Sequence, residues 1–170
     1  MSNKLLIVAH PDDEVIFSGK ELMTSDNWKV ICVTNESNKV RKADFIKVMT
    51  ELHIHDYEIW DFPDYWNGLF NRKELSIRLK KILSENTFEE VLTHNKDGEY
   101  GHTQHKALSA IVSELVDKNL YVFGKGRKMI NIKYLIKKIK LLLLYKSERH
   151  IIFSRMVLEY VIFEKKIKIK

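Results

Sequence analysis

The chain has 170 residues, of which 45% are hydrophobic and 11% aromatic, and its formal net charge is +6 at pH 7. That length suits one compact domain, residues 1–170, and that composition excludes a disordered chain. A single cysteine, Cys32, excludes an internal disulfide. No apolar run approaches the roughly 18 residues of a membrane-spanning helix. We therefore expect a soluble, cytoplasmic protein.

Strand-like and helix-like patterns alternate along the first part of the chain. Apolar runs predict strands at residues 4–9, 29–35, 57–62, 90–95 and 120–124. Between them, apolar residues at helical spacing predict helices at 14–23, 39–52, 72–85 and 102–116. This alternation predicts an α/β fold, namely a three-layer α/β/α Rossmann-like domain with a mostly parallel sheet. In such a sheet, ligands bind outside the carboxyl ends of the strands.

Ionisable side chains follow the first predicted strand directly, in the segment HPDDE. Pro11 suits the first turn of a helix, and a helix N-terminus favours the ionised forms of Asp12 and Asp13. A helix cap would explain one of the two aspartates. A helix cap would not explain the other aspartate or His10, whereas a metal site would use both.

A second ionisable loop, HNKDGEYGHTQH at residues 94–105, follows the fourth predicted strand. His102 and His105 lie three residues apart at the start of a predicted helix, so both rings face the same side. Two unrelated surface histidines are the alternative. With the first loop, they supply a mixed His and Asp set that leaves Zn²⁺ an open position for water, as a catalytic site requires. Spacing alone does not decide which of the two histidines binds the metal.

The motifs AHPDDE and GEYGHTQH resemble those of the LmbE/PIG-L family of zinc-dependent N-deacetylases, and the resemblance extends over residues 4–124. It implies an LmbE-like fold and removal of the N-acetyl group from an N-acetylglucosamine-type amino sugar. The substrate would be a small molecule: a sugar nucleotide, glycan precursor or glycoconjugate. The implied metal is Zn²⁺, with Fe²⁺ as another divalent candidate, and its ligands would be His10, Asp13 and His105.

The resemblance also implies roles for five further residues. Asp12 would be the general base, His102 an acid next to the metal ligands, and Tyr100 would lie beside the developing oxyanion. Arg41 and Asp64 match positions that contact substrate in the family. A solvated helix residue and a turn former are the respective alternatives.

Residues 125–170 form a basic C-terminal segment, with 14 Lys and Arg against 3 Asp and Glu, while residues 1–124 carry 15 against 20. A helix is predicted over residues 130–146. Its apolar face would consist of Ile132, Leu135, Ile136, Ile139, Leu142 and Leu143, and Lys133, Lys137 and Lys140 would lie on another face. This helix either packs on the domain with its lysines in solvent, or it attracts an anionic membrane surface or a polyanionic substrate.

Other functions and partners stay open at this point. An amidase for another N-acyl metabolite or a thiol–sugar conjugate, and a non-catalytic carbohydrate-binding relative, are the alternatives to the deacetylase. The chain is shorter than family members usually are, so a homo-oligomer that completes the site is a further hypothesis. Nucleic-acid binding is not expected, because the lysine face lacks interleaved aromatic residues and residues 1–124 are acidic.

Overall fold

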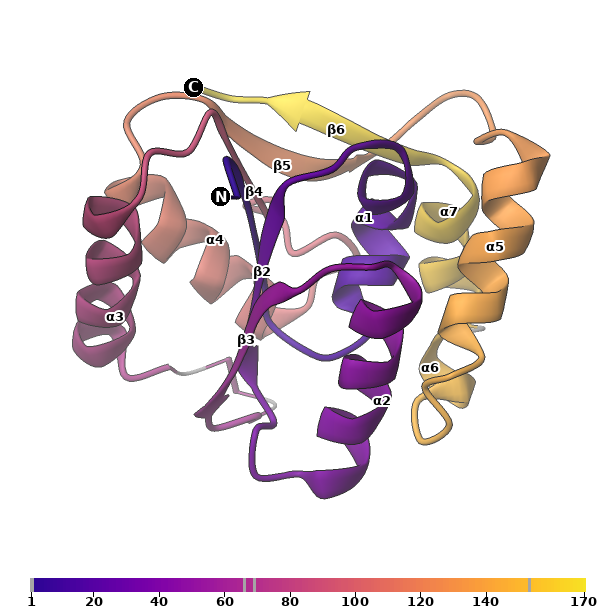
Figure 1. Ribbon diagram of the computed structural model, residues 1–170, viewed down its shortest axis with the longest axis horizontal. Coiled ribbons are helices and arrows are strands. Elements are labelled where there is room, and N and C mark those ends of the chain that lie inside the picture. Colours follow the sequence, from indigo (N-terminus) through magenta and orange to yellow (C-terminus); the bar gives the residue numbers. More distant parts are fainter. Residues whose placement is uncertain (1, 66, 69, 153) are drawn as a thin grey trace.

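The computed structural model describes residues 2–65, 67, 68, 70–152 and 154–170. Within them, one six-stranded sheet has the order β3-β2-β1-β4-β5-β6 (Figure 1). The strands are β1 (Lys4–Val8), β2 (Trp28–Thr34), β3 (Asp56–Phe62), β4 (Glu90–Thr93), β5 (Leu120–Lys125) and β6 (Glu164–Lys168). The helices are α1 (Asp13–Thr24), α2 (Lys39–Glu51), α3 (Arg72–Glu85), α4 (Thr103–Leu115), α5 (Ile132–Leu142), α6 (Arg149–Ile152) and α7 (Arg155–Ile162).

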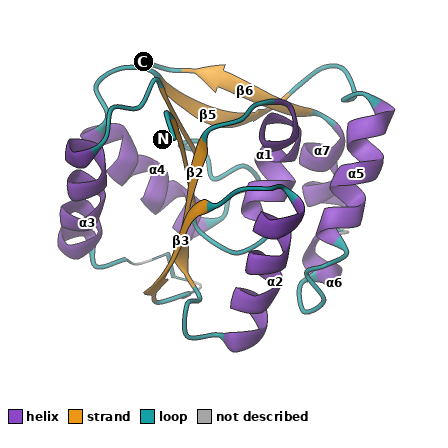
Figure 2. Ribbon diagram, in the orientation of Figure 1, coloured by secondary structure: helices purple, strands orange, loops and turns teal. Residues whose placement is uncertain are grey.

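The sheet is covered by helices on both faces, which confirms the predicted α/β class. Figure 2 shows α3 and α4 on one side of the strands and α1, α2, α5 and α7 on the other. Alternate residues of β1 enter the two cores: Leu5 and Ile7 pack with α3 and α4, whereas Leu6 and Val8 pack with the opposite helices. This follows from the two-residue period of a strand, and it explains why β1 is apolar at every position from Leu5 to Val8.

The order of the strands places the two ionisable loops side by side. β1 pairs in parallel with β2 on one edge and with β4 on the other, so the direction of winding reverses between β1 and β4. A ligand crevice opens at such a switch point, outside the carboxyl ends of the strands. The loops that follow β1 and β4 are the two that the sequence singles out.

The basic C-terminal segment completes the fold. β6 pairs antiparallel with β5 at the edge of the sheet, so the segment ends in a strand and is not helical throughout. α5 lies against α1, where Gly19 leaves room for the stem of Lys138: a Cβ at Gly19 would lie 3.1 Å from Lys138 Cγ. The buried Lys138 ammonium reaches the Glu164 carboxylate, 2.5 Å away.

Glu164 also joins the segment to α1. Ser18 has non-helical backbone angles and interrupts this helix. Just beyond it, the backbone N–H groups of Lys20 and Glu21 donate to the Glu164 carboxylate. The described helices include none that is long and apolar enough to cross a bilayer.

Candidate active site

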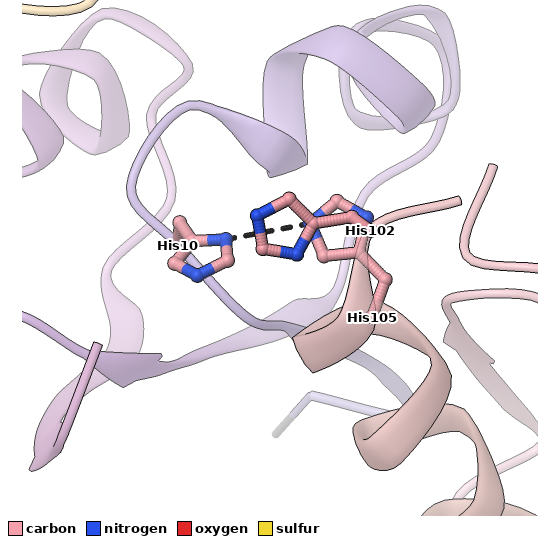
Figure 3. A group of neighbouring side chains, drawn as sticks. All are labelled: His10, His102 and His105. Carbon is pink, nitrogen blue, oxygen red and sulfur yellow. Dashed lines mark hydrogen bonds between the residues drawn. The ribbon is translucent and has the colours of Figure 1, made fainter. Parts of the chain in front are cut away.

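Three potential ligand atoms converge in the crevice beside β1 and β4. The Nδ1 atom of His10 lies 3.3 Å from Oδ2 of Asp13 and 3.3 Å from Nε2 of His105, and these last two atoms are 3.3 Å apart. Figure 3 shows His10 and His105 joined by the dashed line, with the ring of His102 drawn in front of it. Bonds of about 2.0–2.1 Å to a tetrahedral Zn²⁺ place two ligand atoms about 3.3–3.4 Å apart. The spacing of this triad therefore fits a single small divalent cation.

Two other groups of three residues also gather here. Ring nitrogens of His10, His102 and His105 lie within 4.8 Å of one another, as do ligand atoms of Asp13, His94 and His105. His94 is the less suitable ligand, because its Nε2 atom already accepts a hydrogen bond from the backbone N–H of Ala9. His102 lies more exposed than the other rings.

Neighbouring side chains orient the lone pairs of both triad histidines. One oxygen of the buried Glu99 carboxylate accepts from Nδ1 of His105 at 2.7 Å and from Nδ1 of His94 at 2.9 Å. The proton of His105 is thereby held on Nδ1, and its Nε2 lone pair faces the triad. Such carboxylate–histidine pairs fix the tautomer of a metal ligand and raise its basicity.

Gln104 fixes the tautomer of His10 in a similar way. The Gln104 amide nitrogen donates to the backbone oxygen of Pro63 at 2.8 Å, so its amide oxygen must face Nε2 of His10, 2.7 Å away. His10 then donates from Nε2, so in the neutral imidazole the Nδ1 lone pair faces Asp13 and His105. Both triad histidines are thus set as ligands.

The protonation of the triad depends on its carboxylate. Burial raises the pKa of Asp13, but His105 and His10 outweigh it and hold this pKa well below its usual value. Burial lowers the pKa of His10, and its contacts with Asp13 and Asp64 then raise it to about 10. His10 must lose its proton before its Nδ1 can bind a cation, so metal affinity should increase with pH.

Asp12 has an unusual backbone conformation. It occupies the N-cap position of α1, but its side chain makes no capping hydrogen bond, and its φ of 115° is rare for a residue with a side chain. Such a conformation costs of order 1–3 kcal/mol and persists only where neighbours enforce it. Burial and the charge of Asp13 raise the pKa of Asp12 above its usual value. The capping explanation therefore fails for Asp12, whose carboxyl lines the cavity.

Two contacts enforce that conformation, one on each side of the Pro11–Asp12 peptide. The peptide carbonyl accepts from Nη2 of Arg41 at 3.1 Å, and the peptide N–H donates to Glu14 at 3.0 Å. The second oxygen of the buried Glu14 carboxyl accepts from the hydroxyl of Tyr145. Burial raises the pKa of Glu14 to about 7. We call these two contacts the peptide clamp.

A cavity of about 440 Å³ opens beside the triad. Its lining includes every residue that the sequence assigned to the site except His105, which is fully buried behind the others. Four lining residues come from the C-terminal segment: Glu148, Ser154, Met156 and Val157. The basic segment thus forms one wall of the candidate site.

His102 and Tyr100 border this cavity as uncharged donors. Burial, with His105 and His10 nearby, lowers the pKa of His102 to about 4, so this imidazole is neutral at pH 7. Burial and the negative charge of Asp13 raise the pKa of Tyr100. A neutral imidazole and a phenol can both donate a hydrogen bond to an oxyanion.

Arg41 and Asp64 also lie at the cavity and contact each other, with Nη1 of Arg41 3.1 Å from Oδ2 of Asp64. His10, which lies 3.3 Å from Asp64, is the main cause of the lowered pKa of that carboxyl. The guanidinium of Arg41 additionally contacts Pro11 and, at 3.7 Å, Glu148. Several of its donors are therefore occupied by the protein itself.

Sequence reasoning gave no role to three residues that the structure places at the centre: His94, Glu99 and Gln104. Glu99 and Gln104 lie inside the second loop motif, so their positions in the sequence indicated that they lie near the site. What they orient depends on the fold of the loop, because Glu99 adopts a φ of 57° that brings its carboxylate back beneath both histidines.

The chain is similar in sequence to known proteins. The PIG-L family, described as GlcNAc-PI de-N-acetylase, matches residues 5–116. An uncharacterized protein of Acanthamoeba polyphaga mimivirus is 41% identical over 186 residues, which cover 99% of this chain and 81% of that protein.

Solved structures share the fold at low sequence identity. The 4-carboxy-2-hydroxymuconate hydratase GalB of Pseudomonas putida KT2440 has a TM-score of 0.70 at 17% identity, covering 94% of this chain and 83% of the hydratase. A deacetylase of teicoplanin biosynthesis has a TM-score of 0.66 at 14% identity, covering 92% of this chain and 89% of the deacetylase. Because a hydratase and a deacetylase both share it, the fold does not define the reaction.

Proposed function

Because this chain belongs to the PIG-L family, we propose that it is a zinc-dependent hydrolase that removes the acetyl group from an N-acetylglucosamine-type amino sugar. The observation that carries the proposal is the triad of His10, Asp13 and His105, whose three ligand atoms are spaced for one tetrahedral cation. Family membership supports hydrolytic deacetylation.

The bound metal would polarise the amide carbonyl and lower the pKa of a water toward about 7. Asp12, which lines the cavity next to Asp13, takes a proton from that water as it adds to the amide carbon. The raised pKa of Asp12 suits a group that accepts a proton and then returns it to the leaving nitrogen. The C–N bond breaks, and the products are acetate and a free amine.

The uncharged donors act on the tetrahedral intermediate. Tyr100 and neutral His102 line the same cavity and are proposed to donate hydrogen bonds to the developing oxyanion, where one donor is worth about 3–4 kcal/mol. The low pKa of His102 favours this role over that of an acid, so Asp12 is assigned the proton for the amine. Arg41 and Asp64 are proposed to contact sugar hydroxyls at the rim.

Hydrolysis of a different N-acyl compound is the second candidate. Ile16, Met156 and Val157 line the cavity together with the ionisable groups, so part of the wall is apolar. A substrate with an apolar group near its amide would use that wall, whereas a bare sugar would not. A substrate panel therefore has to include N-acylated metabolites and thiol–sugar conjugates.

The test is acetate release by purified protein loaded with Zn²⁺, over a panel of N-acetylated amino sugars. We expect release that a chelator abolishes and that Asp12→Asn lowers by at least about 100-fold. Asp97→Asn is the matched control, since Asp97 is an exposed aspartate in the second loop. No acetate from any N-acetylated amino sugar with metal-loaded protein would refute the proposed substrate class.

A further inference from the structure

The outward face of α5 combines an apolar stripe with a lysine stripe. Ile132, Ile136 and Leu143 lie one above the other at helical spacing, and their exposed fractions are 57%, 51% and 41%. Lys133, Lys137 and Lys140 are exposed beside them. We call these six residues the α5 outer face. α5 itself lies at the outside of the molecule, with α1 between it and the sheet (Figure 1).

This arrangement corrects the sequence-based expectation for the helix. The sequence placed Ile132, Ile136 and Leu143 on one helical face with Leu135, Ile139 and Leu142. In the structure the buried residues of α5 are Leu135, Lys138, Leu141 and Leu142. Lys138 lies on the buried side of the helix, where it pairs with Glu164. Ile132, Ile136 and Leu143 lie on the exposed side.

The charge of the surrounding surface indicates which kind of partner could cover the apolar stripe of the α5 outer face. Residues 125–147 contain eight Lys and Arg and no Asp or Glu, so a second copy docked on the same face would meet like charges. Nucleic acid would match the lysines but would leave the isoleucines in water. An anionic bilayer surface matches both stripes, because lipid phosphates attract lysines while apolar side chains enter the boundary of the acyl chains.

We propose that the α5 outer face docks the protein on an anionic membrane surface. The isoleucines insert shallowly and the lysines lie among the headgroups, with no membrane-spanning element involved. This inference does not depend on the proposed function, because it concerns a face outside the cavity lining.

The test is flotation of the full chain with phosphatidylcholine vesicles that contain or lack phosphatidylserine. We expect flotation only with the anionic vesicles, weakening as salt increases. Each lysine near such a surface is worth about fivefold in affinity. Replacing Lys133, Lys137 and Lys140 together by Gln should thus weaken binding about 100-fold, and Ile132→Ser with Ile136→Ser should also weaken it.

A matched control lies on α3, whose Ile77 is 60% exposed and has exposed lysines nearby. Replacing Lys73, Lys80 and Lys81 together by Gln, or Ile77→Ser, should leave flotation unchanged. Equal losses from the α3 and α5 variants would overturn the proposal, as would no flotation of the wild type at low salt. A dimer that Ile132→Ser dissociates would assign the face to a second copy and overturn it too.

Discussion

The peptide clamp at Asp12 gives a prediction whose size can be worked out from the structure. Tyr145→Phe removes only the hydroxyl that donates to the buried Glu14 carboxyl. A buried acceptor left without its partner costs about 1–3 kcal/mol. We expect the free energy of unfolding, measured by urea denaturation, to decrease by about 2 kcal/mol.

The same substitution should also affect catalysis, because Glu14 holds the N–H of Asp12. If about 1.4 kcal/mol of the free energy that stabilises the strained conformer is lost, the equilibrium constant between it and relaxed conformers decreases about tenfold. We therefore expect kcat to decrease, by up to about tenfold, while KM changes little. Tyr57→Phe, at a half-buried tyrosine on β3 outside the site, is the control.

The outcome can contradict this reasoning in two ways. Tyr145→Phe that is as stable and as active as Tyr57→Phe would show that the hydroxyl does not support Asp12. A loss of stability without any loss of kcat would show that Tyr145 is structural only.

Three further predictions concern the rest of the site and the C-terminal segment. Burial raises the pKa of Glu99, but His94 and His105 lower it to about 2 from 4.5, so its stabilisation is present above about pH 4.5 and lost as the pH falls through about 2. Acid titration monitored by circular dichroism should accordingly show a shallower loss of stability in Glu99→Gln, and an unchanged slope would contradict the assignment. Lys138→Met leaves the Glu164 carboxylate buried without its cation and should cost about 3 kcal/mol in urea denaturation; a variant as stable as wild type would show that the pair does not anchor the segment. Gly98 has a φ of 67°, and a Cβ there would lie 2.4 Å from the backbone oxygen of His102. Gly98→Ala should therefore lower the free energy of unfolding by about 2 kcal/mol or more. An unchanged thermal midpoint would contradict this prediction.

The sheet and its main helices could be predicted because their signals are local. The mostly apolar β1 and β2 indicate strands covered on both faces, and the helical spacing in α3 and α4 indicates helices that pack on one side. The meeting of the two loops could also be predicted, because the carboxyl ends of parallel strands lie at one edge.

Long-range pairing explains what the sequence did not reveal. The orientation of α5 depends on Glu164, a residue 26 positions beyond Lys138. β6, with the sequence EKKIK, has the charge of a solvated segment, and it forms a strand because the edge of β5 offers free backbone groups. The orienting roles of Glu99 and Gln104 likewise depend on loop conformation and on the backbone of Pro63.

The most direct test of the account is X-ray diffraction at the zinc absorption edge from crystals grown with Zn²⁺. We predict one anomalous peak about 2.0–2.1 Å from Nδ1 of His10, Oδ2 of Asp13 and Nε2 of His105. A fully loaded, folded protein whose peak lies elsewhere, or that shows none at this triad, would contradict the central claim.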